Sequence, residues 1–335
     1  MSGRGAFLAT KVAWALVTIA IVITFNFFLF RVLPGDPAKA GIRDPRLNPA
    51  TQAALTQRFG LNKPVFLNLA GGNPLDSQYF AYLGALSQGD LGESYAYRDK
   101  KVSDLIGGAL VNTLWLVLPA ELLSIVLGVV LGLVAAWRRR TWIDVSALSF
   151  SLFMWSLPTF FLGIILLFVG AAWFDLPTAG SGTIGATFAS PWDWLLDRGR
   201  HLLLPTVTFT LVLLGEYMLI MRSSVIDVFS EDYILTAKAK GLSTFRIIRD
   251  HALRNAMLPM VTLIAINLGF TVSGAIQVEE VFSWPGIGAL TVEAVSKRDY
   301  PVLQGAFLLL AITVVLANLV AELIYGWLDP RVSEG

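Results

Sequence analysis

The chain has 335 residues, of which 55% are hydrophobic and 15% charged, and its formal net charge is +1. This composition leaves too little polar surface to cover a soluble globule, so it predicts a membrane protein. The sequence has no cysteine and only two histidines, which excludes a disulfide, a Cys-ligated zinc site, a thiol nucleophile and a histidine-rich metal site. We therefore expect this chain to hold no metal.

The first apolar run, residues 12–33, is longer than the about 20 helical residues that cross a bilayer core. Basic residues before it and Ala38-Lys-Ala40 after it also fit a secretory signal, but such signals have apolar runs of only about 7 to 15 residues. We expect residues 1–33 to hold the N-terminal tail and a retained spanning helix, which Leu33-Pro-Gly-Asp-Pro37 stops.

Residues 34–108 mix Pro, Gly, Asn and charges of both signs, and they contain no spanning run. Helical patterns appear at residues 48–59 and around 75–86. This stretch predicts one small extracytoplasmic region between the first two spans.

Five further apolar runs bring the predicted number of spans to six, so the fold class is an all-α polytopic membrane protein. The runs cover residues 109–137, 142–172, 203–222, 257–279 and 303–327. Pro158 is expected to kink the third span, either as a packing feature or as part of a gate. Gly128 and Gly132 form a GxxxG pair that predicts close helix packing rather than a dimer contact.

The charges of the short loops predict the orientation. Arg138-Arg-Arg140 and the basic segment 223–256 lie on one side, whereas the loop before the fourth span carries Asp175, Asp193 and Asp197. Because Lys and Arg gather on the cytoplasmic side, both termini are expected to be cytoplasmic, including the tail 328–335.

Residues 223–256 form the long polar segment between two apolar runs. Ser230 is a good N-cap, two acids follow it, Lys238 and Lys240 occupy the last turn, and Gly241 can end the helix. A second helix is predicted from Ser243 towards Pro259. Its apolar face is expected to hold Phe245, Ile248, Ala252 and Ala256. The pair predicts an L-shaped elbow, and the alternative is an amphipathic elbow that lies on the membrane surface.

The elbow resembles the cytoplasmic coupling loop of binding-protein-dependent ABC importer permeases, in which Glu-Ala-Ala is followed by a Gly and later by Leu-Pro. Gly241 and Leu258-Pro259 match this signature, and Leu235-Thr236-Ala237 keeps only the last Ala. Further strings resemble the dipeptide, oligopeptide and nickel branch of the family. They are Pro34-Gly-Asp-Pro37, Gly60-Leu-Asn-Lys-Pro64, Gly89-Asp-Leu-Gly-Glu-Ser94, Glu280-Val-Phe-Ser-Trp-Pro-Gly-Ile-Gly288 and Arg298-Asp-Tyr-Pro301.

The resemblance implies the type I ABC importer permease fold, with a five-helix core at 109–327 in a bacterial inner membrane. It implies a pathway shared with a homologous second permease, two cytosolic ABC ATPase subunits or domains that hold ATP and Mg, and an extracytoplasmic solute-binding protein. The substrates implied are di- or oligopeptides moved by alternating access, with nickel or an oligosaccharide as the alternatives. No cofactor on this chain and no nucleic acid partner are expected.

By the same resemblance, the first helix of the elbow contacts the ATPase. The coupling residues would be Asp232, Tyr233, Thr236, Ala237, Lys238, Ala239, Lys240, Gly241 and Leu242. The outer loop would meet the binding protein through Trp284, Pro285, Gly286 and Asp299.

Several kinds of chemistry are missing from the sequence. It has no Gly-Lys dipeptide and so no P-loop, which means that ATP would be hydrolysed by another chain. Gly180-Ser-Gly-Thr-Ile-Gly185 matches GxGxxG, but no strand precedes it. No nucleophile, base and metal group together, so we expect no enzyme. A secondary transporter or channel is the remaining rival, but it usually shows an inverted repeat, and none is seen here.

Three carboxylates fall within the predicted spans, where an acid costs at least about 2.5 kcal/mol. Glu216 and Glu322 lie near the inner ends and are predicted to be paired structural groups. Glu121 lies deeper and is a candidate, with Pro158 and Asn267, for the substrate pathway, where it would hold a cationic group such as a peptide amine. The alternative for Glu121 is an interhelical hydrogen bond, as also predicted for Asn26 and Asn267.

Overall fold

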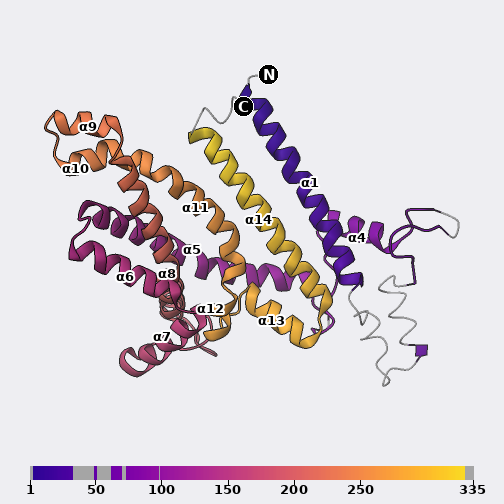
Figure 1. Ribbon diagram of the computed structural model, residues 1–335. Coiled ribbons are helices and arrows are strands. Elements are labelled where there is room, and N and C mark those ends of the chain that lie inside the picture. Colours follow the sequence, from indigo (N-terminus) through magenta and orange to yellow (C-terminus); the bar gives the residue numbers. More distant parts are fainter. Residues whose placement is uncertain (1–2, 33–48, 51–61, 70–72, 98, 329–335) are drawn as a thin grey trace.

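The structure is a computed structural model that describes residues 3–32, 49–50, 62–69, 73–97 and 99–328 (Figure 1). In these ranges the regular structure is helical, and one isolated antiparallel bridge joins Glu93 to Lys101. The string at residues 34–37 and most of the helical pattern at 48–59 lie outside the described residues.

Five stretches of the described chain are long and apolar enough to cross a membrane. They are α1 (Gly3–Val32), α5 (Val102–Trp137), α8 (Pro191–Val228), the run from α10 (Thr244–Ile247) through η1 (Ile248–Ala252) into α11 (Leu253–Gly274), and α14 (Tyr300–Leu328). The pair α6 (Trp142–Ser156) and α7 (Thr159–Phe174) supplies a sixth span if the two are counted together. The chain is therefore an all-α, multi-pass membrane protein, as predicted.

The third predicted span is broken rather than kinked. Its two halves, α6 and α7, meet at 103°, and Pro158 is the N-cap of α7. Proline has no backbone N–H to continue the ladder and clashes with the preceding turn, so the first helix ends at Ser156. Pro158 does interrupt the span, as predicted, but the prediction of one kinked helix over 142–172 is wrong because the span is two separate helices.

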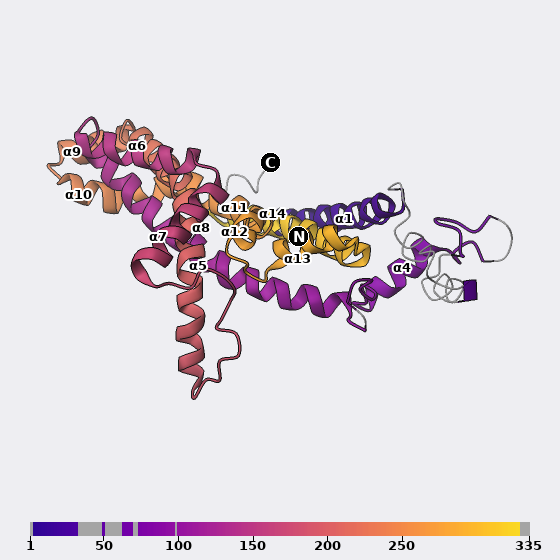
Figure 2. The same cartoon turned by 90° about the horizontal axis from the view of Figure 1, so that it is seen from below.

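Helices α5 and α8 both begin well before the apolar runs that predict them. Helix α5 starts at Val102, inside the stretch expected to be an outer loop. Its first turns carry Ser103, Asp104 and two glycines, so they do not belong to the apolar run that predicts the span. Helix α8 starts at Pro191 behind the N-cap Ser190, whose hydroxyl accepts a hydrogen bond from the Asp193 amide at 3.2 Å. The polar residues of this first part hide the helix from a search for apolar runs, and Figure 2 shows it projecting from the bundle.

Glycines set the contact between α5 and α8. A Cβ on Gly128 would lie 2.4 Å from the Cβ of Tyr217, and one on Gly132 would lie 2.7 Å from the Cβ of Met221. Only glycine allows the two backbones to approach this closely. The prediction that the GxxxG pair serves helix packing is confirmed.

Helices α1 and α14 pack side by side, with the start of α1 and the end of α14 towards the same end of the molecule. The Asn26 side chain donates to the Gln304 carbonyl at 3.2 Å, which confirms the predicted interhelical bond. Lys11 pairs with Glu322 at 3.2 Å, so the predicted partner for that carboxylate exists. The start of α1, the end of α14 and the elbow all lie towards one end of the molecule in Figure 1.

Besides the helices of the elbow, three short helices of the described chain lie towards the other end. They are α4 (Gln78–Ser87), close to the predicted 75–86, α12 (Ile276–Val281) and α13 (Ile287–Lys297). Helix α4 packs on α1 through Tyr79, whose ring centroid is 5.2 Å from that of Phe27 and whose hydroxyl lies 2.8 Å from the Thr24 Oγ1.

Candidate functional site

The first helix of the elbow is α9 (Asp232–Ala239). Its N-cap is Glu231, so the prediction that Ser230 caps this helix is wrong. The Ser230 hydroxyl instead donates to the Asp227 carbonyl at 2.6 Å, at the end of α8. Gly241 has φ +74°, a left-handed conformation that glycine adopts without steric cost, and it ends the helix as predicted.

A small apolar core joins α9 to the following helix. Ile234, Ala237, Ile247 and Ala252 are buried in it. Ala237 is only 5% exposed, so it holds the elbow together and is not open to another protein. Phe245, predicted on the buried face, is 61% exposed, because α10 is short and the π-turn η1 changes the phase of the helix after it.

The other predicted coupling residues lie on the surface of the elbow. Asp232, Tyr233, Thr236, Lys238, Ala239, Lys240 and Gly241 are exposed, and Leu242 is half-buried. The Tyr233 hydroxyl accepts a hydrogen bond from Asn255 at 2.6 Å, and Lys238 lies 5.3 Å from the centroid of the Phe229 ring. The elbow therefore presents a polar ridge that is fixed to the ends of α8 and α11.

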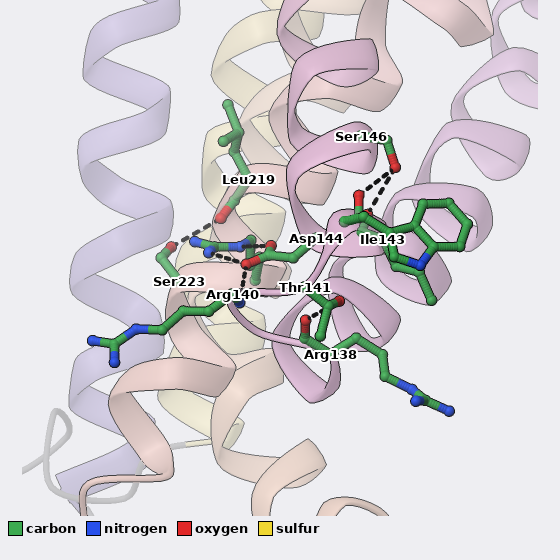
Figure 3. A network of polar contacts seen from close by, with 10 residues as sticks. Arg138, Arg140, Thr141, Ile143, Asp144, Ser146, Leu219 and Ser223 are labelled. Atoms are coloured by element: carbon green, nitrogen blue, oxygen red, sulfur yellow. Dashed lines mark hydrogen bonds and ion pairs between the residues drawn. The ribbon is translucent and has the colours of Figure 1, made fainter.

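An ion pair between a buried carboxylate and a partly exposed guanidinium ties α6 to α8 (Figure 3). Asp144 is 2% exposed and accepts from Arg222 Nε at 2.6 Å and Nη2 at 2.9 Å. The Arg140 amide also donates to Asp144, at 2.9 Å. The two residues lie in different spans, so no local pattern in the sequence links them, and only the position of Asp144 in the first turn of α6 hints at the pair.

The deep polar residues share one network. The Tyr217 hydroxyl donates to Glu121, which is 2% exposed. Asn267 donates to the Glu216 Oε2 at 3.1 Å and to the Tyr217 hydroxyl at 3.2 Å. The predicted partner for Glu216 and the interhelical bond of Asn267 are thus confirmed. Glu121 and Asn267 come together around Tyr217, Pro158 lies at the α6–α7 break, and a pathway role for all three stays a prediction.

Glu279 organises the other end of the molecule and was missed in the sequence. Its buried carboxylate accepts from the Thr113 hydroxyl at 2.6 Å and from the amides of Gly288 at 2.7 Å and Ala289 at 3.0 Å. It therefore caps the first turn of α13. Burial raises the pKa of the Glu279 carboxyl, while these three donors oppose the rise. A Cβ on Gly286 would lie 2.1 Å from Glu279 Oε1, which explains this glycine in the family string.

We call residues 282–286 the outer turn. Trp284 is fully buried and its Nε1 donates to the Asn112 carbonyl at 2.8 Å, whereas Pro285 is exposed. A cavity of about 410 Å³ opens beside the turn, and Pro285, Glu280 and Glu293 are among its lining residues. Trp284 and Gly286 hold the turn in place, and contact with a binding protein through this region stays a prediction.

Asp299 joins two of the family strings. It is 1% exposed and accepts from the Ser94 hydroxyl and, at 3.1 Å each, from the amides of Tyr95 and Ala96. The strings that end at Ser94 and begin at Arg298 are therefore docked on one another. Because Asp299 lies inside, its direct effect is on the shape of the surface at this end of the molecule.

Comparisons with known proteins agree with this architecture. Residues 128–334 match the family described as binding-protein-dependent transport system inner membrane component. The di/tripeptide transport system permease protein DppB of Pseudomonas aeruginosa (strain UCBPP-PA14) is 34% identical over 97% of this chain and 98% of its own length. The oligopeptide transport system permease protein AppB of Bacillus subtilis (strain 168) is 33% identical over 95% of this chain and 96% of its own. The glutathione transport system permease protein GsiC of Salmonella typhimurium (strain LT2) is 34% identical over 94% of each.

The fold is also found among solved structures. A chain of the MetNI methionine ABC transporter, from a structure of its inward facing conformations, aligns with a TM-score of 0.54 and 15% identity. The alignment covers 67% of this chain and 96% of that chain, which shows a shared fold. With the matched family residues and the full-length relatives, the chain belongs to the inner membrane components of binding-protein-dependent transport systems, the permeases of ABC importers.

Proposed function

We propose that this chain is one of two homologous permeases in an ATP-driven importer of di- or oligopeptides. Together they line a pathway that opens alternately to the two sides of a bacterial inner membrane. Two ATPase subunits or domains bind ATP and Mg on the cytosolic side, and a soluble binding protein delivers the peptide from outside.

The observation that carries the coupling role is the form of α9. It is a short helix with its own apolar core, it ends at a left-handed Gly241, and its polar ridge is exposed. A second protein that presses on this ridge moves α9 as a unit, and the Asp144–Arg222 pair helps transmit that motion to α6 and α8.

The proposed substrate is supported by the names of the relatives. They describe transport systems for di- and tripeptides, oligopeptides and glutathione, and all three kinds of molecule are peptides. Selection between peptide lengths is assigned to the binding protein.

The proposed orientation places the elbow and both termini in the cytoplasm and residues 62–97 outside. Asn73 is exposed, and the chain has no native thiol. Asn73→Cys should therefore react with an impermeant maleimide in intact cells. Labelling that occurs only after lysis contradicts the orientation.

The test of the function is uptake of a labelled dipeptide by proteoliposomes that contain both permeases, the ATPases and the binding protein. Uptake should require ATP inside and the ATPase chains. Gly241→Leu should lower uptake at least about five-fold while the complex still assembles, because a side chain forces the left-handed residue and the helix end to move.

Gly84→Leu is the matched control, since its site in α4 is equally open but lacks a positive φ. Uptake that continues without the ATPases would support a secondary transporter instead. Normal uptake by Gly241→Leu would remove α9 from the coupling path.

A further inference from the structure

Arg198, in the first part of α8, lies among three tryptophans from different parts of the chain. Its guanidinium carbon is 5.5 Å from the ring centroids of Trp115 and Trp194 and 5.2 Å from that of Trp284. A guanidinium at this distance is attracted to the face of an aromatic ring. The three rings belong to α5, α8 and the outer turn, so one side chain contacts all three elements.

The same guanidinium sets the orientation of Asn112 on α5. Arg198 Nη2 donates to the Asn112 Oδ1 at 2.5 Å. Because a guanidinium can only donate, the amide oxygen must face it, which turns the Asn112 Nδ2 towards the outer turn. There Nδ2 donates to the Pro285 carbonyl at 2.9 Å, next to the bond from Trp284 Nε1 to the Asn112 carbonyl.

An arginine at this position is less favourable for stability than an apolar side chain of similar size would be. Arg198 Nε is buried and has no hydrogen-bond partner in the part of the chain that the structure describes. A buried unpaired donor is unfavourable, and an apolar side chain would avoid that cost. A cation that is kept at such a cost is better explained by the geometry that it imposes.

The helix that carries Arg198 also leads to the elbow. Further along α8, Arg222 binds Asp144, and α8 ends at Val228, a short turn before α9. Two more hydrogen bonds link the loop before α8 to the residue next to Arg198 and to the outer turn. Asp197 accepts from the Thr183 amide at 2.9 Å, and the Gly180 amide donates to the Phe282 carbonyl at 2.9 Å.

We propose that Arg198 is a positioning residue for transport coupling. It holds the outer turn on α5 and α8 through Asn112 and Trp284, so that a binding protein that docks on the turn shifts α8 and, through it, the elbow. This inference rests on the proposed function.

The experiment measures ATPase activity of the reconstituted complex, with and without saturating binding protein. Arg198→Leu keeps the apolar contact with the rings but removes the cation and the donor to Asn112. It should lower the stimulation by binding protein at least about five-fold, the lower end of usual coupling between sites, while basal hydrolysis stays within about two-fold of wild type. Arg198→Lys retains the charge without the fork and should restore part of the stimulation.

Two controls make the result specific. Arg200→Leu, on the same helix, removes an exposed guanidinium that donates to the Asp175 carbonyl at 3.1 Å, and it should behave as wild type. Asn112→Ala combined with Arg198→Leu should be no worse than either single change, since both act through one node. A spin label on Ser283→Cys, in this thiol-free chain, should become more mobile in Arg198→Leu.

Wild-type stimulation in Arg198→Leu would overturn the proposal. So would basal and stimulated hydrolysis that fall in parallel with a lowered unfolding temperature, because that pattern indicates lost packing alone. A wild-type complex that binding protein does not stimulate would instead contradict the proposed function, so the two failures are distinguishable.

Discussion

The elbow and the outer turn lie towards opposite ends of the molecule and are held by different chemistry. At the end of the molecule that carries the outer turn, the carboxylates of Glu279 and Asp299 are buried, and hydroxyl and backbone N–H donors satisfy them. At the elbow, a small apolar core carries an exposed polar ridge, and the nearby buried carboxylate of Asp144 is paired with a cation.

Under the proposed function, this difference determines how each end meets its partner. A carboxylate with several directional donors fixes one backbone geometry, so the outer turn is formed before anything docks on it. The ridge of α9 makes few contacts within the chain, so its polar groups remain available to another protein. The outer end is a preformed surface, whereas the elbow is a surface that is completed by its partner.

The largest expected effect comes from breaking the ion pair at the inner end. Arg222→Leu leaves Asp144 buried without its cation and should lower the free energy of unfolding by about 3 kcal/mol, at the low end for such pairs because Arg222 is partly exposed. Thermal unfolding of the purified complex measures this change. Asp144→Ala together with Arg222→Leu should recover part of the loss.

Arg249→Leu is the control for that prediction. Arg249 and Asp250 have the same 2.6 Å separation as the inner pair but are exposed, and surface pairs of this kind contribute little to stability because water screens them. Equal losses in the two variants would show that burial of Asp144 does not decide the strength of the inner pair.

The next effect comes from overpacking the outer turn. Gly286→Ala puts a methyl group into the Glu279 carboxylate and should destabilise the protein by about 1–3 kcal/mol or more, seen as reduced yield and a lower unfolding temperature. Gly84→Ala, at an open helical site, should be neutral or slightly stabilising. A tolerated Gly286→Ala would mean that the outer turn is not preformed.

Two alanines of α9 allow the core of the elbow and its ridge to be tested independently. Ala237→Leu overfills the buried core and should destabilise the elbow by about 1–3 kcal/mol, measured as faster proteolysis between α9 and α10. Ala239→Leu leaves folding unchanged but should weaken binding of the ATPase, since Ala239 is on the ridge. If Ala239→Leu destabilised the elbow and Ala237→Leu only weakened ATPase binding, the assignment of the buried and exposed faces of α9 would be wrong.

A smaller effect is expected from pH at the outer turn. Because the folded-state pKa of Glu279 is raised, its contribution to stability is complete below the ordinary glutamate pKa of about 4.3 and is lost as pH rises through the folded value. Glu279→Gln should therefore gain stability relative to wild type as pH increases. Thermal unfolding at several pH values checks this, and a constant difference between the two proteins would contradict it.

The smallest structural effect is expected at the deep network. Glu121→Gln keeps an acceptor for the Tyr217 hydroxyl, so the free energy of unfolding should change by less than about 1 kcal/mol. If the carboxylate holds a peptide amine in transit, uptake of substrates with a free amine falls while assembly stays normal. Uptake that is indifferent to this change for all substrates would remove Glu121 from the pathway.

Local patterns in the sequence predict much of this fold. Apolar runs predict the spans, Gly241 predicts the end of α9, and the spacing of Gly128 and Gly132 predicts close packing of α5. These features depend on residues that are close in sequence or on one conformational preference, so they are visible without a structure.

The residues that organise the outer turn are not predictable in this way. Thr113 and Glu279 are 166 positions apart, and Asn112 and Arg198 are 86 apart, so no periodic pattern links them. The family strings draw attention to Trp284 and Asp299, but only the structure reveals that both are buried supports. The early start of α8 was hidden for a related reason, since its first turns are polar.

Two glycines described above should differ in how a genetic screen can repair them. The three atoms nearest to a Cβ at Gly286 all belong to the Glu279 carboxylate, so a shorter residue at position 279 should suppress the steric part of the defect. A Cβ at Gly241 would meet nothing within 4 Å, and the defect there is the left-handed backbone itself. No contact residue can relieve that strain, so suppressors of Gly241 variants should map to the partner surface that receives the elbow.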